Sequence, residues 1–297
     1  MPKNLGLKMN PTTQLEFGID RAKEQDRNYN LGGRSFYFFD FDDNIAVLAT
    51  PLILFHKETH AEIQISSGEF ANHHHDIGHR GIYENFLIDY DDHKGTFRNF
   101  RDHHTSELEG FENLKNIFID DVAHALGFPD FHWKGPSWNC FYHAAFNQRP
   151  LSLITARGHN PETLREGIKL FVHSKMIPDE PNYIGIFPVN HKPTRQLLGD
   201  PDFTLSVPEL KQRAIRESVN RALKNYGYSP HHRFGMSDDD PKNISMIIEE
   251  MTRLKTNLPE ISFFVIETTQ GQFIKHEITL NSLTSEKIQE TDQLTLW

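Results

Sequence analysis

The chain has 297 residues, of which 37% are hydrophobic and 24% charged, with a formal net charge of −10 and one cysteine, Cys140. This composition fits one large core with an insertion, and it disfavours a binder of duplex nucleic acid, which needs excess Lys and Arg. A mean hydropathy of −0.57, no apolar run of about 20 residues and no apolar leader predict a soluble, cytoplasmic protein without membrane contact.

Residues 1–33 are predicted to form an N-terminal extension before the first strand. That strand is the apolar run 36–39, and it ends at three closely spaced carboxylates, Asp40, Asp42 and Asp43. Residues two apart in an extended backbone lie on the same side, so Asp40 and Asp42 present two acids together. Two interpretations remain open here: an Asp-rich turn, or a site for chemistry on a phosphate.

The phosphate interpretation follows from the residue types. A phosphoryl group is surrounded by negative oxygens, so a carboxylate can approach it only where a cation such as Mg²⁺ neutralises the site. Asp40 could then attack phosphorus and form an aspartyl-phosphate. Asp42 would protonate the leaving alcohol and later deprotonate the attacking water.

About 100 residues separate this motif from the next strand of the core. A connection of that length is too long for a simple crossover in a compact sheet, so we expect an insertion. We place it at 51–136 and assign 34–50 and 137–297 to the core.

Within the insertion, the pattern predicts a β-hairpin from 51–55 and 61–65, a strand at 96–100 and a helix over 107–126. The histidine-rich stretch 73–79 is a weak candidate for a metal site, because adjacent histidines point in different directions on a helix or a strand. A solvated or substrate-facing loop is the favoured interpretation, and an anionic substrate is an alternative partner.

A second strand, 151–155, ends in a hydroxyl and is followed by a helical pattern at 162–172. The residues just after it, Ala156 and Arg157, are expected on the rim of the site, together with Asn44. For Arg157, a contact to substrate phosphate and an ion pair that braces the loop are both open.

The strands 183–189 and 261–266 continue the α/β alternation. Between them, Ser206 and a proline in the first turn predict a helix that runs to about residue 226. An edge strand is predicted at 272–278. The alternation of strands and helices predicts a parallel sheet of about five strands.

A third junction of strand and helix carries the acidic triplet Asp238, Asp239 and Asp240, placed before the apolar-periodic stretch 244–251. Carboxylates there suit a hard cation. Asp240 could be a ligand in place of either neighbour, or it could cap the helix.

The order and context of these motifs resemble those of the haloacid dehalogenase-like superfamily of phosphohydrolases. The first motif is Asp40-Phe41-Asp42-Asp43-Asn44, the second ends at Thr155, and the fourth contains Asp238 and Asp239. The resemblance implies a Rossmann-like three-layer core, with the insertion as a mixed α+β cap. The family usually has Thr or Val at the position of Asn44.

The resemblance also implies roles. Asp40 would be the nucleophile and Asp42 the acid/base, while Thr155 would donate a hydrogen bond to the transferring phosphoryl oxygen. The Asp40 carboxylate, the Asp42 backbone carbonyl, Asp238 and Asp239 would hold Mg²⁺.

The third motif of the family is a lysine near the start of a helix. Lys211 fits best, because it follows the predicted helix start at Ser206. Lys192 and Lys224 are alternatives, for which a solvated surface position is favoured.

The sequence thus predicts a Mg²⁺-dependent phosphatase that acts on a small phosphorylated metabolite. An Asp two residues after the nucleophile is typical of the phosphatases of the family and disfavours a dehalogenase. One alternative is a phosphotransferase, or a phosphatase for nucleotides or polynucleotide ends, on the same core. Another is a binding module that kept the fold without turnover. Substrate identity and oligomeric state stay open.

Overall fold

A computed structural model describes residues 22–102, 116–268, 273–280 and 283–287. Its main element is a mixed sheet of seven strands in the spatial order β10-β9-β8-β7-β1-β5-β6. The five strands from β8 to β6 run parallel, and β9 and β10 continue one edge antiparallel. The strands are β1 Ser35–Phe39, β5 Pro150–Thr155, β6 Asn182–Pro188, β7 Arg233–Asp238, β8 Ser262–Glu267, β9 Ile274–Ile278 and β10 Leu283–Lys287.

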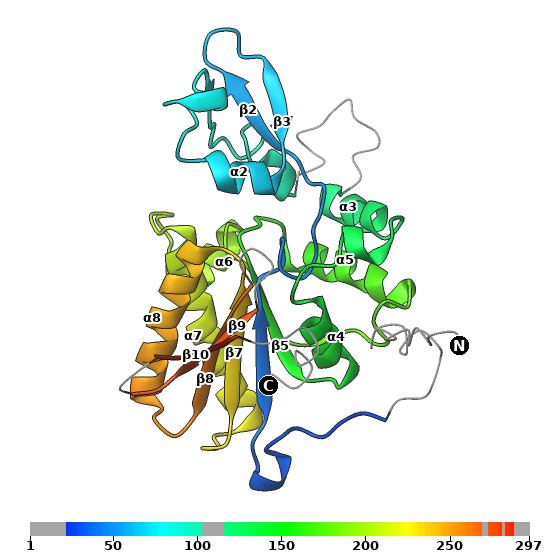
Figure 1. The fold of residues 1–297 in the computed structure, drawn as a ribbon, viewed down its shortest axis with the longest axis vertical. Coiled ribbons are helices and arrows are strands. Elements are labelled where there is room, and N and C mark those ends of the chain that lie inside the picture. Colours follow the sequence, from blue (N-terminus) through cyan, green and yellow to red (C-terminus); the bar gives the residue numbers. More distant parts are fainter. Residues whose placement is uncertain (1–21, 103–115, 269–272, 281–282, 288–297) are drawn as a thin grey trace, which may run out of the picture.

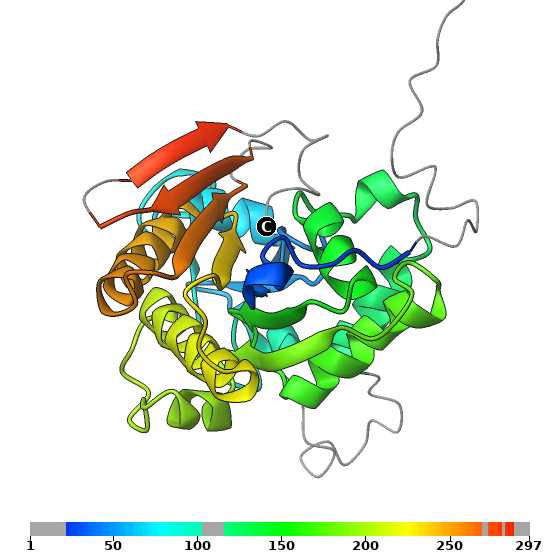
Figure 2. The ribbon, with the colours of Figure 1, turned by 90° about the horizontal axis from the view of Figure 1, so that it is seen from below.

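Helices cover both faces of this sheet, with α7 and α8 on one side and α3, α4 and α5 on the other (Figure 2). The predicted α/β class is therefore confirmed. The α-helices in the described residues are α2 Ser67–His73, α3 Ile117–Ala125, α4 Trp138–Phe146, α5 Pro161–His173, α6 Lys192–Leu197, α7 Val207–Tyr226 and α8 Pro241–Asn257.

The central strand β1 is buried on both faces. Phe36 and Phe38 join the hydrophobic cluster under α7 and α8, while Tyr37 and Phe39 join the cluster under α3, α4 and α5. A parallel strand between two helical layers is apolar at every position, which explains the uninterrupted aromatic run in the sequence.

A second, small sheet lies beyond the carboxyl ends of the main strands (Figure 1). It contains β2 Leu52–His56, β3 Glu62–Ile65 and β4 Phe86–Leu87 in the order β3-β2-β4, all antiparallel. The hairpin predicted from the start of the insertion is confirmed. With α2, the small sheet encloses its own cluster of buried side chains: Leu52, Leu54, Ile65, Ile77 and Tyr83.

The prediction of a strand at 96–100 is wrong. Residues Arg98–Phe100 form a 3-10 helix, and Phe97 and Phe100 pack against the small cluster. The chain turns just before them because the Asp91 carboxylate accepts the backbone N–H groups of residues 93 and 94. Two aromatic residues beside such a turn can be buried without a partner strand.

The helix predicted over 107–126 is only partly described. Residues 103–115 lie outside the described residues, and α3 begins after Asn116, whose side chain accepts the N–H of Phe118. Phe118, Val122 and Trp133 belong to the large cluster beneath the main sheet. The second half of the predicted insertion therefore packs with the core.

The described part of the N-terminal extension is anchored to the core. Asp26 forms a buried ion pair with Arg149 at 2.9 Å and accepts the backbone N–H of Ser35 at 3.0 Å. Residues 1–21 lie outside the described residues. Within the described chain, no helix has the length and apolar character needed to span a bilayer.

Candidate active site

The neighbouring strands β7, β1 and β5 end at the same edge of the main sheet. Phe39 is in register with Ser237 on one side and Leu153 on the other. Asp40, which follows β1, and Asp238, the last residue of β7, therefore meet the end of β5 at Thr155 at this edge. Asp40 and Asp238 are about 200 residues apart in the sequence.

Three carboxylates form a compact group at this edge. Asp40, Asp238 and Asp239 each offer an oxygen within 4.8 Å of the others. Asp40 and Asp238 are buried, and Asp239 is half-buried. Because carboxylate oxygens are the ligands that hard divalent cations prefer, this donor set could hold Mg²⁺.

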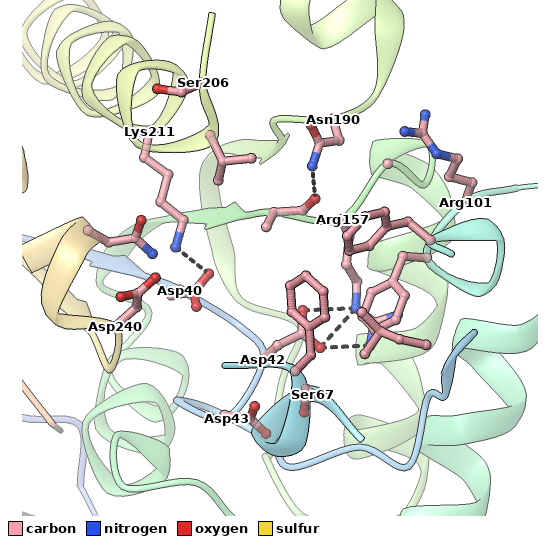
Figure 3. Close-up of a pocket in the computed structure, with 18 of the residues that line it drawn as sticks. Asp40, Asp42, Asp43, Ser67, Arg101, Arg157, Asn190, Ser206, Lys211 and Asp240 are labelled. Atoms are coloured by element: carbon pink, nitrogen blue, oxygen red, sulfur yellow. Dashed lines mark hydrogen bonds and ion pairs between the residues drawn. The ribbon is translucent and has the colours of Figure 1, made fainter. Parts of the chain in front are cut away.

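The Lys211 ammonium lies between two of these carboxylates. Its Nζ is 2.6 Å from Asp238 Oδ2. The same Nζ is 3.1 Å from Asp40 Oδ1 (Figure 3). Burial lowers the pKa of Lys211, but the charges of Asp238 and Asp40 outweigh burial and raise it above the ordinary value. Lys211 is thus a buried, permanently charged partner of the proposed nucleophile.

The two alternative lysines lie elsewhere. Lys192 pairs with Asp92 at 2.6 Å, and its side chain is 60% exposed. Lys224 is exposed near the C-terminus of α7. Of the three candidate lysines, the structure brings Lys211 to the carboxylate group.

Burial shapes the charges of the acidic group. It raises the pKa of Asp40 well above the ordinary value, and Asp238 adds to the effect while Lys211 opposes it. Burial, with the charge of Asp238, raises the pKa of Asp239 to about 7. Burial and the neighbouring carboxylates thus disfavour the ionised forms, and a bound cation would favour them.

Asp238 is held from the helix side. Asn243 donates to its Oδ1 at 3.1 Å, and the backbone N–H of Asp240 donates to the same oxygen at 3.1 Å. The Asp240 side chain accepts the N–H of Lys242 and is the N-cap of α8. Of the roles left open for Asp240, the structure shows the capping one.

Asp42 faces a different partner. Arg157 binds the Asp42 carboxylate, with Nε at 3.0 Å from both oxygens and Nη2 at 2.6 Å from Oδ1 (Figure 3). The Thr155 hydroxyl donates to Asp42 Oδ2 at 3.2 Å. The guanidinium lies over the rings of Phe100 and Phe118, with centroid distances of 4.7 and 4.8 Å. Of the two interpretations of Arg157, the structure shows the ion pair.

Arg157 is further fixed by Thr50, whose hydroxyl accepts from Nη2 at 3.0 Å and donates to Asp121. The guanidinium side chain is 1% exposed. Ala156 and Arg157 both line the pocket described below.

Asn44 differs from the expected rim position. It is fully buried, and its amide donates to the Asp40 carbonyl at 3.1 Å and to the Ser237 hydroxyl at 2.7 Å. Its carbonyl accepts from Ser137 at 2.8 Å and from Thr268 at 3.0 Å. Asn44 therefore ties together four segments beneath the carboxylates and does not line the pocket.

A cavity of about 850 Å³ opens between the carboxylates and the small sheet. Its floor contains Asp40, Asp42, Asp239 and Lys211. None of the described histidines lines it, so the structure does not place the histidine-rich stretch against a substrate there.

Several residues at or beside this cavity were not found from the sequence. Asn243 had a usable signal, because it lies in the first turn of a helix that starts directly after the acidic triplet. Thr50, Arg101 and Arg195 had none, since they reach the site only through the packing of distant segments.

Comparisons with protein-family models, with curated proteins and with solved structures each gave no match for this chain.

Proposed function

We propose that this protein is a Mg²⁺-dependent phosphatase that hydrolyses a phosphate monoester through an aspartyl-phosphate on Asp40. The observation that carries the proposal is the position of Asp40, a buried carboxylate on the floor of a cavity, paired with Lys211 and grouped with Asp238 and Asp239. A purely structural ion pair does not require two further acids beside it.

The fold supports the proposal. A mostly parallel sheet between helical layers agrees with the Rossmann-like three-layer core that the haloacid dehalogenase-like resemblance implies. The small sheet covers the carboxyl edge and could act as the cap that excludes water and selects substrates. In this interpretation the cap comprises residues 51 to about 100.

The first half-reaction uses Asp40 and Asp42. The Asp40 carboxylate attacks phosphorus, a new O–P bond forms, and the bond from phosphorus to the alcohol oxygen breaks while Asp42 supplies the proton. Mg²⁺ held by Asp40, Asp238 and Asp239 would neutralise the phosphoryl oxygens. Lys211 is placed to oppose protonation of Asp40 and to balance negative charge.

The second half-reaction uses Asp42 as a base. Water attacks phosphorus of the aspartyl-phosphate and gives a proton to Asp42, which releases phosphate and restores Asp40. The ion pair with Arg157 holds the Asp42 carboxylate in position for this step. Thr155, bonded to Asp42, lies beside the same position.

The test is phosphate release from p-nitrophenyl phosphate with Mg²⁺ and with EDTA. We expect metal-dependent turnover that falls below about 0.1% of the wild-type rate in Asp40→Asn. Asp179→Asn is the matched control, because Asp179 is an exposed carboxylate that pairs with Lys23 outside the cavity. Equal rates in wild type and Asp40→Asn would contradict the proposal and favour a binding module.

A further inference from the structure

The wall of the cavity opposite the carboxylates is aromatic. Leu52 and a set of rings from the small sheet and its loops line this wall, and a further ring comes from the loop before α7. The rings are Phe70, Tyr90, Phe97, Phe100 and Phe203. The acids of the lining, in contrast, all come from the strand ends and loops that follow β1 and β7.

Two of these rings are unusually exposed. Tyr90 is 76% exposed and Phe203 is 41% exposed, although both line the cavity. Tyr90 lies over Phe97 with a centroid distance of 6.0 Å and an interplanar angle of 29°, and Phe97 meets Phe70 edge-on at 5.4 Å. Phe70, Phe97 and Tyr90 thus form one continuous aromatic surface, and Tyr90 leaves it largely exposed at one end.

The cations of the lining are all engaged. Within the described lining, Arg101 pairs with Asp92 at 2.7 Å and Arg195 with Asp200 at 2.7 Å. Arg157 is held by Asp42 and Lys211 by the buried acids. Each cation of the described lining thus already has a carboxylate partner, with Asp92 shared between Arg101 and Lys192, and this disfavours a second anionic group on the substrate.

Neutral polar groups are also few. The described lining contains the hydroxyls of Ser67, Ser206 and Tyr90, of which Ser206 donates to Glu209. The Asn190 amide donates to the Ala156 carbonyl at 2.6 Å, and the Asn243 amide donates to Asp238 at 3.1 Å. A sugar with several hydroxyls needs many oriented donors and acceptors, because each desolvated hydroxyl without a partner weakens binding. The wall instead favours a flat apolar group, which can stack on Tyr90 and Phe97.

Resting on the phosphatase function proposed above, we infer that the substrate is a monophosphate whose alcohol carries an uncharged planar aromatic ring. The ring stacks against the surface formed by Phe70, Phe97 and Tyr90 while the phosphate reaches Asp40. Nucleoside monophosphates and aryl phosphates share this chemistry. The cavity volume of about 850 Å³ leaves room for a leaving group much larger than a phosphate.

The first experiment compares kcat/KM for adenosine 5′-monophosphate, phenyl phosphate, ribose 5-phosphate and a sugar bisphosphate. Adenosine monophosphate and ribose 5-phosphate differ mainly by the ring, and we expect about a tenfold or greater preference for the ring-bearing compound. The arms with the nucleotide and with phenyl phosphate separate the two sources of aromatic ring. Equal or better turnover of ribose 5-phosphate or of the bisphosphate would overturn the inference.

The second experiment tests the surface itself. Tyr90→Ala should lower the ratio of kcat/KM for adenosine monophosphate over ribose 5-phosphate by about tenfold. Phe131→Ala is the matched control, because Phe131 is 80% exposed and lies outside the lining, and it should leave the ratio unchanged. An unchanged ratio in Tyr90→Ala would contradict the role of this surface.

Failure of the phosphatase proposal has a different signature, which is no turnover of any of the four compounds. In that case calorimetric titration of wild type and Tyr90→Ala with adenosine monophosphate and ribose 5-phosphate decides the inference. Preferential binding of the nucleotide that is lost in the variant supports the aromatic site. Equal binding of both compounds, or none, overturns it.

Discussion

The carboxyl edge of the main sheet and the small sheet that covers it line one cavity with opposite chemistry. Asp40 and Asp238 are held at the edge by neighbouring parallel strands and by a buried lysine. The small sheet contributes rings such as Phe97, which are held by a small apolar cluster. Polar groups with directional partners have one defined position, whereas apolar contacts tolerate substitution more readily. We therefore expect mutations at the carboxyl edge to have large effects on stability and activity, and mutations in the small sheet to have small effects.

The largest effect is expected at Lys211. In Lys211→Met the buried acids Asp40 and Asp238 lose their shared cation, which should lower the free energy of unfolding by about 3–5 kcal/mol. Urea denaturation in EDTA measures this loss, and Mg²⁺ should reduce it by shielding the same carboxylates. Lys224→Met is the control, because Lys224 is exposed. A variant as stable as the control would contradict the arrangement.

The second largest effect is expected at Arg157. Its guanidinium orients Asp42 through a bidentate contact that Lys cannot form. Arg157→Lys should lower kcat about tenfold for an alkyl phosphate, since its leaving group needs a proton from Asp42. The loss should be smaller for p-nitrophenyl phosphate, whose leaving group departs unprotonated. Arg165→Lys, a half-exposed pair, serves as control. Equal losses for both substrates would show that Arg157 does not act through Asp42.

The third prediction concerns pH. A cation binds the ionised form of Asp239, whose pKa is about 7, and must displace the proton below that value. The affinity for Mg²⁺ should therefore rise by roughly tenfold between about pH 5.5 and 7 and then level off. Calorimetric titration with Mg²⁺ across this range measures the effect. Asp239→Asn should flatten the curve, and a flat curve in the wild type would refute the assignment.

The smallest effect is expected where the region of the small sheet meets the core. Lys192 pairs with Asp92 across this junction, but the lysine side chain is 60% exposed, so the pair should contribute less than about 1 kcal/mol. Lys192→Ala should change KM by less than about threefold, with the difference fading at high salt. Steady-state kinetics at two salt concentrations tests this. A tenfold change in KM would show that the contact between Lys192 and Asp92 controls closure of the small sheet over the site.

The two regions also differ in how well the sequence predicted them. The strand ends at Asp40, Thr155 and Asp238 were predicted from the sequence, and parallel strands that alternate with helices place their carboxyl ends at one edge. That these three strands are neighbours was implied by the family resemblance, and the strand pairing shows it. The prediction of a strand at 96–100 was wrong, because two aromatic residues beside a turn have no hydrophobic periodicity that identifies a strand.

Ambiguities within the site had a physical cause as well. Three consecutive acids have the same ligand chemistry, so only the path of the backbone could assign the cap of α8 to Asp240. Asn44 was expected at the rim. Its buried position was not predicted, because its hydrogen-bond partners, Ser137, Ser237 and Thr268, come from distant segments. No local pattern identifies a hydrogen-bonded centre of this kind.

The sequence by itself determined the order of strands and helices in the core and the acids at the strand ends, because each depends on local periodicity or on residue chemistry. Lys211 was selected among three lysines by the family resemblance. Only the tertiary structure decided that Arg157 grips Asp42, that α3 packs with the core, and that an aromatic surface faces the carboxylates. These features depend on which distant segments come into contact, and that is set by the packing of the whole chain.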